Sequence, residues 1–216
     1  MTTDGIIFDI DGTIWDSTDI VATAWNEAIK EFLLLDTKNT ISIEALNKER
    51  LKSLFGKTMD IIAKELFPNL SEQDQAKLLE ICDTYEKKYL IKNQEDITYP
   101  GVKETIKTLS KTHKIFIVSN CQKGYIELCL DKNNLWPYIT AIECYGNTKQ
   151  KKGFNIAKII QENKLKTPIY VGDTQLDFEA SKENTIPFIW ASYGFGKPVS
   201  YTAKITTITE LLTLIS

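Results

Sequence analysis

Residues 5–13, GIIFDIDGT, decide how this chain of 216 residues folds. The apolar run at residues 6–8 carries no polar alternation and leads directly into an acidic turn that contains a glycine. Such a run is typical of a strand that is buried on both faces of a parallel sheet. We therefore expect a short buried strand over residues 2–8, with Asp9 and Asp11 directly after its end.

The residues after this turn switch to helical spacing. Apolar side chains between Ile20 and Leu33 fall on one face of a helix. Three further helices are predicted, at residues 43–54, 58–66 and 71–89. We therefore expect residues 16–95 to be almost entirely helical.

After residue 100 the pattern changes to strands and helices in alternation. Strands are predicted at residues 114–119, 141–144, 168–172 and 187–191. Helices are predicted at residues 102–109, 125–132, 154–162, 176–182 and 208–215. This alternation indicates a parallel sheet that helices cover on both faces. The first strand must join that sheet, because a helical segment offers it no strand to pair with.

We therefore predict an α/β fold with a Rossmann-like parallel sheet core and an all-helical cap inserted after the first strand. The core comprises residues 1–15 and 96–216, and the cap comprises residues 16–95.

The composition excludes several classes of function. Hydrophobic residues make up 43% of the chain and charged residues 25%, which is the profile of an ordinary globular protein. The net charge is −3 and no basic arm stands out, so we expect no nucleic-acid partner. No apolar run approaches the roughly 20 residues of a membrane span, the N-terminus lacks the pattern of a signal peptide, and the four cysteines form no CxxC pair. We expect a cytoplasmic protein with no membrane partner and with reduced thiols.

Ligands of an open parallel sheet bind at the carboxyl ends of its strands. The predicted strand ends carry Asp9, Asp11, Ser119, Asn120 and Asp173. The first acidic turn also fits a tight hairpin turn. In the last segment, the acidic residues also fit the cap and first turn of a helix, with Asp173 as the N-cap. The alternative to these local roles is a shared site for a cation and a substrate.

Carboxylates gathered at one edge of the sheet repel one another strongly. Two unit charges about 4 Å apart repel by about 4 kcal/mol at an effective dielectric constant of 20. Mg²⁺ offsets such repulsion, since it favours a few carboxylates together with water and phosphate oxygens. A lysine is the natural second cation, and the run at residues 149–152 precedes a predicted helix whose N-terminus lies at the same edge.

With these motifs in place, the chain resembles the haloacid dehalogenase superfamily phosphatases, in particular their phosphoglycolate phosphatase-like group. The four motifs of that family follow in order: DxDGT at Asp9–Thr13, the strand-end serine Ser119, a lysine before a helix at Lys152, and GDxxxD at Gly172–Asp177. The family's helical cap corresponds to residues 16–95. Its lysine is often followed by proline, whereas Gly153 follows here, so a shift within the lysine run stays open.

The resemblance implies a role for each motif residue. Asp9 would attack phosphorus, and Asp11 would protonate the leaving alcohol and then deprotonate water. Mg²⁺ would be held by Asp9, the main-chain carbonyl of Asp11 and Asp173, with support from Asp177. The catalytic and phosphate-binding groups would further include Gly12, Thr13, Ser119, Asn120 and Lys152. In the cap, Arg50 and Lys57 are candidates for substrate binding.

The expected function is Mg²⁺-dependent hydrolysis of a small phosphomonoester, with 2-phosphoglycolate as the leading candidate. The expected partner is thus a small phosphorylated metabolite, bound by a monomer or a homodimer. Two alternatives stay open, a sugar phosphomutase of the same family and a non-catalytic phospho-accepting module. Residues 194–196, GFG, are interpreted only as a turn near the mouth of the site.

Overall fold

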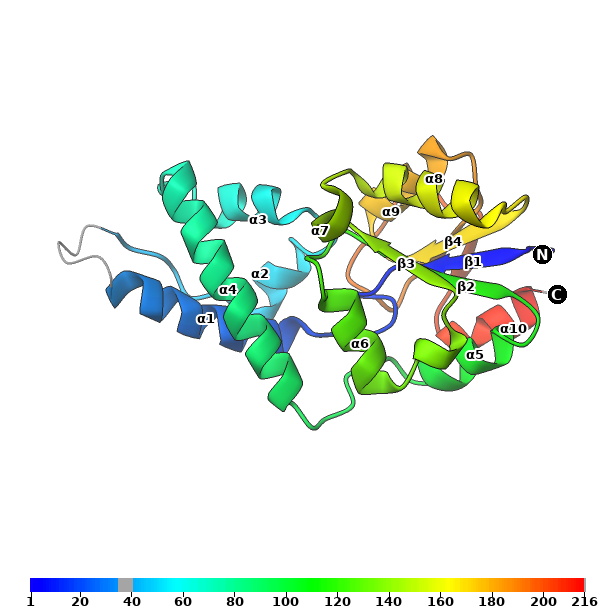
Figure 1. The fold of residues 1–216 in the computed structure, drawn as a ribbon, viewed down its shortest axis with the longest axis horizontal. Helices are drawn as coiled ribbons and strands as arrows, with labels where there is room; N and C mark the ends of the chain where they lie inside the picture. Colours follow the sequence, from blue (N-terminus) through cyan, green and yellow to red (C-terminus); the bar gives the residue numbers. More distant parts are fainter. Residues whose placement is uncertain (35–40, 216) are drawn as a thin grey trace. The chain divides into compact units, whose positions relative to one another are not determined.

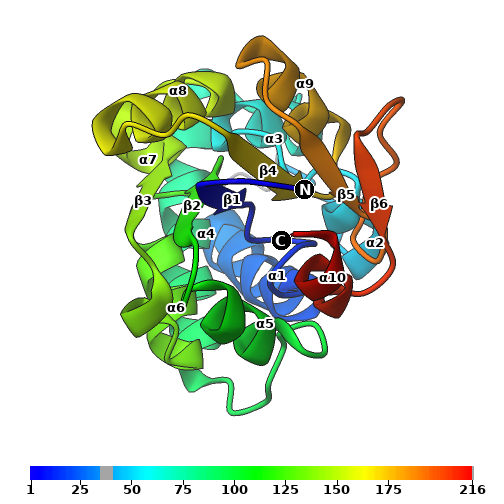
Figure 2. The ribbon, with the colours of Figure 1, turned by 90° about the vertical axis from the view of Figure 1, so that its right-hand side faces the viewer.

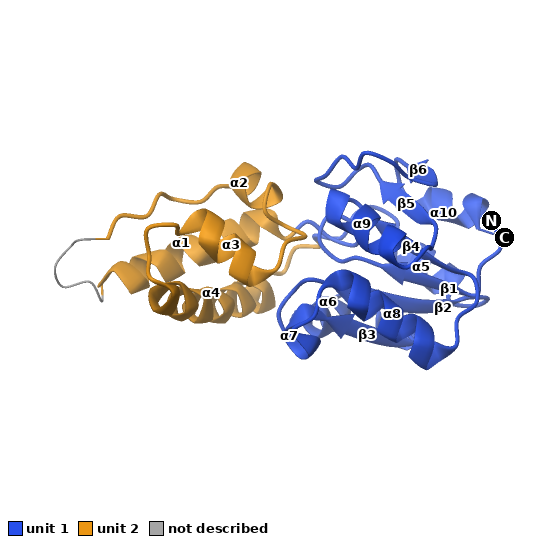
Figure 3. Ribbon diagram, turned by 90° about the horizontal axis from the view of Figure 1, so that it is seen from above, with its two compact units in different colours: residues 1–16, 97–216 blue, residues 17–96 orange. Residues whose placement is uncertain are grey.

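The computed structural model describes residues 1–34 and 41–215. The chain forms two compact units, shown in different colours in Figure 3. Residues 1–16 and 97–216 form the first, here called the α/β unit, and residues 17–96 form the second, the helical unit.

The α/β unit is built on a six-stranded sheet with the order β3-β2-β1-β4-β5-β6, all of whose strands are parallel (Figures 1 and 2). Its strands are β1 (Gly5–Phe8), β2 (Lys114–Ser119), β3 (Ala141–Cys144), β4 (Pro168–Gly172), β5 (Phe188–Ala191) and β6 (Ala203–Ile205). The predicted parallel sheet is confirmed, and β6 is an edge strand that the sequence patterns did not indicate. Strand β1 pairs with β2 on one edge and with β4 on the other. The strands that follow in sequence are therefore added first on one side of β1 and then on the other. A reversal of this kind is where an open sheet places its ligand site.

Helices cover both faces of the sheet. The helices of this unit are α5 (Val102–Leu109), α6 (Tyr125–Asn133), α7 (Tyr145–Thr148), α8 (Lys152–Asn163), α9 (Gln175–Glu183) and α10 (Leu211–Leu214). Short 3-10 turns are found at Trp136–Tyr138 and Ile208–Glu210. Helices α8 and α9 pack on one side of the sheet, and α5 and α10 lie on the other (Figure 2).

The central strand is fully buried, as its apolar run predicts. Ile6, Ile7 and Phe8 have no solvent exposure. Ile7 lies in a cluster that joins the sheet to α8 and α9, and whose other members include Phe116, Tyr170, Ile156, Ile159 and Phe188. Burying one such side chain contributes about 1.5–3 kcal/mol, so this layer sets β1 rigidly between its neighbours.

The helical unit comprises α1 (Thr18–Leu34), α2 (Lys48–Lys52), α3 (Met59–Leu66) and α4 (Glu72–Lys92). Helix α1 packs along α4. The four helices together bury an apolar cluster that includes Val21, Trp25, Ala28, Phe32, Leu51, Ile62, Leu78 and Cys82. The indole of Trp25 donates to the Glu86 carboxylate at 2.7 Å, so its polar atom is satisfied inside this cluster. A helical insertion between β1 and β2 is thus confirmed.

The predicted helix at residues 43–54 is wrong over its first half. Helix α2 covers only Lys48–Lys52, and it begins after Asn47, whose side chain accepts from the Arg50 amide at 2.8 Å. The amide group of Asn26, on α1, donates to the Leu46 carbonyl and accepts from the Leu46 amide, both at 2.8 Å. These bonds take the backbone groups that a helix through Leu46 would need.

Among the described residues, no helix has both the length and the apolar character needed to cross a membrane.

Candidate active site

The loop after β1 is held against the loop after β4. Gly12 has φ = 78°, a conformation that favours glycine, and a Cβ at this position would lie 2.2 Å from a carboxylate oxygen of Asp173. The chain after Gly12 does not return along β1, because both edges of β1 are occupied. The hairpin alternative for this turn is therefore wrong, and the turn instead brings Asp9 and Asp173 together.

Three aspartates, from these two loops and the first turn of α9, form one buried cluster. Asp9, Asp173 and Asp177 each place a carboxylate oxygen within 4.8 Å of the others. Asp9 is 1% exposed, and the other two are fully buried. Asp9 is distant in sequence from Asp173 and Asp177, and the pairing of β1 with β4 is what makes them neighbours.

Lys152 supplies the positive charge of this cluster. Its ammonium lies 3.0 Å from Asp9 Oδ1 and 2.6 Å from Asp177 Oδ1, and its side chain is 3% exposed. Burial opposes its charged form, yet the Asp177 and Asp9 carboxylates raise the pKa of Lys152 above the usual value. Lys149 and Lys151 are exposed. Within the lysine run, Lys152 is thus the residue that reaches the carboxylates.

Asp177 has both of its oxygens occupied by protein donors. Oδ2 accepts from the Thr174 hydroxyl at 2.7 Å and from the Thr174 and Asp173 amides at 2.9 and 3.2 Å. Oδ1 accepts from Lys152 at 2.6 Å and from the Tyr170 hydroxyl at 3.2 Å. Burial raises the pKa of Asp177, but Lys152 and Thr174 outweigh burial and hold this pKa below its usual value. Asp177 is therefore suited to orient Lys152 and the loop.

The local capping hypothesis for this segment is correct in part. Helix α9 begins after Thr174, which forms a capping box with Asp177. The prediction that Asp173 is the N-cap is wrong, since the side chain of Asp173 turns instead to the loop that follows β5. The Asp177 carboxylate therefore both takes part in the cap of α9 and binds Lys152.

Asp173 keeps one oxygen for another ligand. Its Oδ2 accepts from the Phe195 amide at 2.6 Å and the Gly196 amide at 3.3 Å. Its Oδ1 is buried and has no hydrogen-bond partner among the described residues. Burial, and then the charges of Asp177 and Asp9, raise the pKa of Asp173 well above its usual value.

Asp9 is likewise a buried carboxylate that lies close to other charged groups. Burial raises the pKa of Asp9 to about 6, although the Lys152 ammonium opposes this change. A divalent cation at Asp9 and Asp173 would offset the cost of both buried charges, and carboxylate oxygens are the ligands that Mg²⁺ prefers. The donor set and the unpartnered oxygen of Asp173 therefore fit such an ion.

The loop over Asp173 is a part of the site that the sequence patterns indicated only as a turn. A Cβ on Gly194 would lie 2.3 Å from the Gly12 carbonyl oxygen and 2.4 Å from Asp173 Cβ, so glycine is required there by close approach. The Tyr193 hydroxyl donates to the Thr13 carbonyl at 3.0 Å. The signal in the sequence is the pair of glycines, Gly194 and Gly196, in the loop that follows a strand.

Polar groups suited to phosphate oxygens lie at the same edge. Ser119 is the last residue of β2, the neighbour of β1, and is 5% exposed; Asn120, which follows it, is 8% exposed. Thr13 Oγ1 is buried and, within the described part of the chain, has no hydrogen-bond partner. The predicted site residues of the α/β unit thus meet at one end of the sheet.

Asp11 is held by two aromatic residues that the sequence patterns did not identify. Its Oδ1 accepts from the Tyr125 hydroxyl at 2.7 Å and from the Trp15 indole at 3.0 Å. Neither aromatic residue belongs to a motif, and no local signal marks them.

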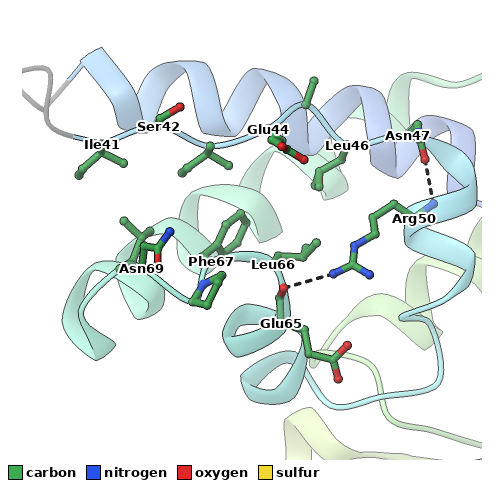
Figure 4. Close-up of a pocket in the computed structure, with 14 residues that line it drawn as sticks. Ile41, Ser42, Glu44, Leu46, Asn47, Arg50, Glu65, Leu66, Phe67 and Asn69 are labelled. Atoms are coloured by element: carbon green, nitrogen blue, oxygen red, sulfur yellow. Dashed lines mark hydrogen bonds between the residues drawn. The ribbon is translucent and has the colours of Figure 1, made fainter.

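Arg50 and Lys57 lie in the helical unit, where both contact Glu65. The Arg50 guanidinium donates to the Glu65 carbonyl at 3.2 Å, beside a pocket of about 760 Å³ that Arg50, Glu65 and Phe67 help to line (Figure 4). The Lys57 ammonium lies 2.7 Å from both carboxylate oxygens of Glu65. Their predicted contact with substrate stays a prediction.

The chain matches a known protein family. The family model for haloacid dehalogenase-like hydrolases matches residues 6–191. A phosphoglycolate phosphatase of Pseudomonas syringae pv. tomato is 24% identical over 97% of this chain and 78% of its own length. One of Vibrio parahaemolyticus is 23% identical over 90% of this chain and 87% of its own length.

Solved structures share the fold. A predicted phosphoglycolate phosphatase from Haemophilus somnus superposes with a TM-score of 0.84 at 18% identity, covering 98% of this chain and 97% of that one. A predicted phosphatase from Clostridium acetobutylicum gives 0.81 at 19% identity, covering 99% and 98%. Because the family model spans most of the sequence, the chain belongs to the haloacid dehalogenase-like hydrolases, and the relatives that it resembles are phosphoglycolate phosphatases.

Proposed function

We propose that this hydrolase is a Mg²⁺-dependent phosphatase that cleaves a small phosphomonoester through an aspartyl-phosphate on Asp9. The observation that carries the proposal is the buried cluster at the sheet edge. There Asp9 lies 3.0 Å from the Lys152 ammonium and beside Asp173, whose Oδ1 is unpartnered among the described residues. A nucleophile, a fixed positive charge and a cation site are the parts that phosphoryl transfer needs.

The residues that would hold Mg²⁺ are Asp9, Asp173 and the main-chain carbonyl of Asp11, with Asp177 in support. When bound, the ion supplies positive charge to the oxygens of the transferring phosphoryl group. Asp177 already accepts from Lys152 and Thr174, so its part in this proposal is to keep Lys152 and the loop in place.

The chain's own residues account for the remaining chemistry. The Asp9 carboxylate forms a bond to phosphorus while the bond from phosphorus to the alcohol oxygen breaks, and Asp11 gives its proton to the departing oxygen. Asp11 then takes a proton from the water that cleaves the aspartyl-phosphate, which releases inorganic phosphate and restores Asp9. Lys152 and polar groups at Gly12, Thr13, Ser119 and Asn120 bind the phosphoryl oxygens, where charge must be neutralised.

The leading candidate substrate is 2-phosphoglycolate. The support is the activity for which the Pseudomonas and Vibrio relatives are named. We assign the helical unit the role of a cap in which Arg50 and Lys57 recognise the substrate carboxylate. This assignment requires both side chains to exchange contacts with Glu65 for contacts with the substrate.

The decisive experiment replaces Asp9 with asparagine and measures phosphate release from a panel of phosphomonoesters, with and without Mg²⁺. We expect the wild-type chain to turn over many times only with Mg²⁺, and Asp9→Asn to fall to background while keeping its circular dichroism spectrum. Asp60→Asn, an exposed aspartate of α3, is the matched control and should keep full activity. Metal-dependent turnover by Asp9→Asn would disprove the assignment.

The same assay separates the two alternatives. A sugar phosphomutase would need a sugar bisphosphate activator and would return phosphate to a sugar rather than to water. A phospho-accepting module would label Asp9 once and release no further phosphate. Multiple turnover with free phosphate as the product supports the phosphatase over both.

A further inference from the structure

We propose that Tyr125 and Trp15 are positioning residues that hold the Asp11 carboxylate for proton transfer. The inference rests on the proposed function, because it gives these two side chains a part in the step that Asp11 performs. Neither residue lies among the motif residues, and neither is itself expected to contact phosphate.

Both aromatic side chains donate to the same carboxylate oxygen. The Tyr125 hydroxyl lies 2.7 Å from Asp11 Oδ1, and the Trp15 indole nitrogen lies 3.0 Å from it. Two hydrogen bonds on one oxygen restrain the carboxyl group against rotation about its last torsion, which in a free aspartate is broad.

The two donors are themselves fixed. Trp15 is fully buried and Tyr125 is 4% exposed, and their rings meet edge to face with centroids 5.5 Å apart and an interplanar angle of 77°. The Trp15 carbonyl accepts from the Gly12 amide at 2.9 Å, within the catalytic turn itself. Tyr125 is the first residue of α6 and follows Gly124, whose φ is 90°. Backbone geometry therefore sets where both donors point.

The two hydrogen bonds fix the orientation in which Asp11 presents its carboxyl group to the leaving alcohol. Holding a catalytic group in one orientation removes an entropic cost from the transition state, which is the contribution that we assign to Tyr125 and Trp15.

Tyr125→Phe tests the proposal, because phenylalanine keeps the ring contact with Trp15 and removes only the hydroxyl. The variant is compared with the wild type on two esters, an alkyl phosphomonoester (2-phosphoglycolate) and p-nitrophenyl phosphate. The alkoxide needs a proton as it leaves, whereas p-nitrophenolate leaves readily without one. A defect in positioning the acid should therefore depend on the leaving group, and a general structural defect should not.

We expect kcat/KM on the alkyl ester, which reports the step in which the alcohol leaves, to fall about tenfold, the kinetic equivalent of one lost hydrogen bond. On p-nitrophenyl phosphate, kcat/KM should change by less than about twofold, since protonation contributes little there. Tyr85→Phe is the control: it removes a hydroxyl that donates to Glu31 at 2.6 Å in the helical unit, and both esters should be unaffected.

An equal loss of kcat/KM on both esters, or no loss of kcat/KM on either, would overturn the positioning role. Failure of the proposed function is seen separately, in the wild type. If the unmodified chain released no phosphate from either ester with Mg²⁺, the phosphatase assignment itself would be wrong, and the positioning role would be lost with it.

Discussion

Lys152 lies buried between two carboxylates, so replacing it with methionine should reveal what its charge contributes. The methionine side chain is about as long as that of lysine, but it carries no charge. It therefore cannot pair with Asp9 or Asp177, which lie 3.0 and 2.6 Å from the Lys152 ammonium. The side chain is 3% exposed, so water cannot take over its role without a rearrangement of the cluster.

The magnitude follows from this burial. Removing one partner of a buried ion pair costs about 3–5 kcal/mol, because the remaining charges stay in the interior without compensation. For a chain of this size, 1 kcal/mol shifts the melting temperature by about 2–4 °C, so we expect a decrease of about 6–20 °C for Lys152→Met.

The loss of stability caused by Lys152→Met should be greater at high pH than at low pH. Without Lys152, the pKa values of Asp9 and Asp177 in the folded state rise above those of the unfolded chain. The folded variant then binds more protons than its unfolded form, so its free energy of unfolding falls as pH rises. We expect the deficit relative to the wild type to be larger at about pH 8 than at about pH 5, where protonation relieves the repulsion.

The measurement is thermal and urea-induced unfolding in buffer with a chelator, at both pH values. Lys151→Met is the matched control, since Lys151 is adjacent and exposed, and it should unfold as the wild type does. A deficit below about 1 kcal/mol, the range of an exposed ion pair, or a deficit of equal size at both pH values, would refute the reasoning.

Two further predictions concern the cation site. Gly194→Ala should destabilise the protein by about 1–3 kcal/mol and weaken Mg²⁺ binding, which titration calorimetry and melting curves would measure. The reason is that its Cβ would come within 2.3 Å of the Gly12 carbonyl oxygen and 2.4 Å of Asp173 Cβ; unchanged affinity would show that the loop does not position Asp173. Affinity for Mg²⁺ should increase as pH rises through about 6, because burial raises the pKa of Asp9 to about 6 and protons compete with the ion below that value. Without Mg²⁺, the raised pKa values of Asp9 and Asp173 make the folded state take up protons, so its free energy of unfolding should fall over the same rise in pH. An affinity that stays flat from about pH 5 to about pH 7 would contradict the role of Asp9.

Sequence patterns by themselves determined the elements and their order. The apolar run before Asp9 predicted a strand buried on both faces, and β1 is that strand, with Ile6, Ile7 and Phe8 free of solvent exposure. Alternating strands and helices after residue 100 predicted the parallel sheet. These features are readable because backbone periodicity and burial act over a few neighbouring residues.

Tertiary structure alone decided which side chains meet. Lys152 was one of several candidates in its run, and only the position of α8 against the sheet selects it. The first half of the helix predicted at residues 43–54 does not form, because the Asn26 side chain of α1 binds the backbone of Leu46.

The donors to Asp11 show the same limit. Tyr125 is more than a hundred residues from Asp11, and nothing near either residue in sequence records their contact. Pairings of this kind depend on strand order and on the close approach of loops, which bring distant residues together. Local periodicity carries no information about such contacts, because each partner satisfies its own local pattern equally well without the other.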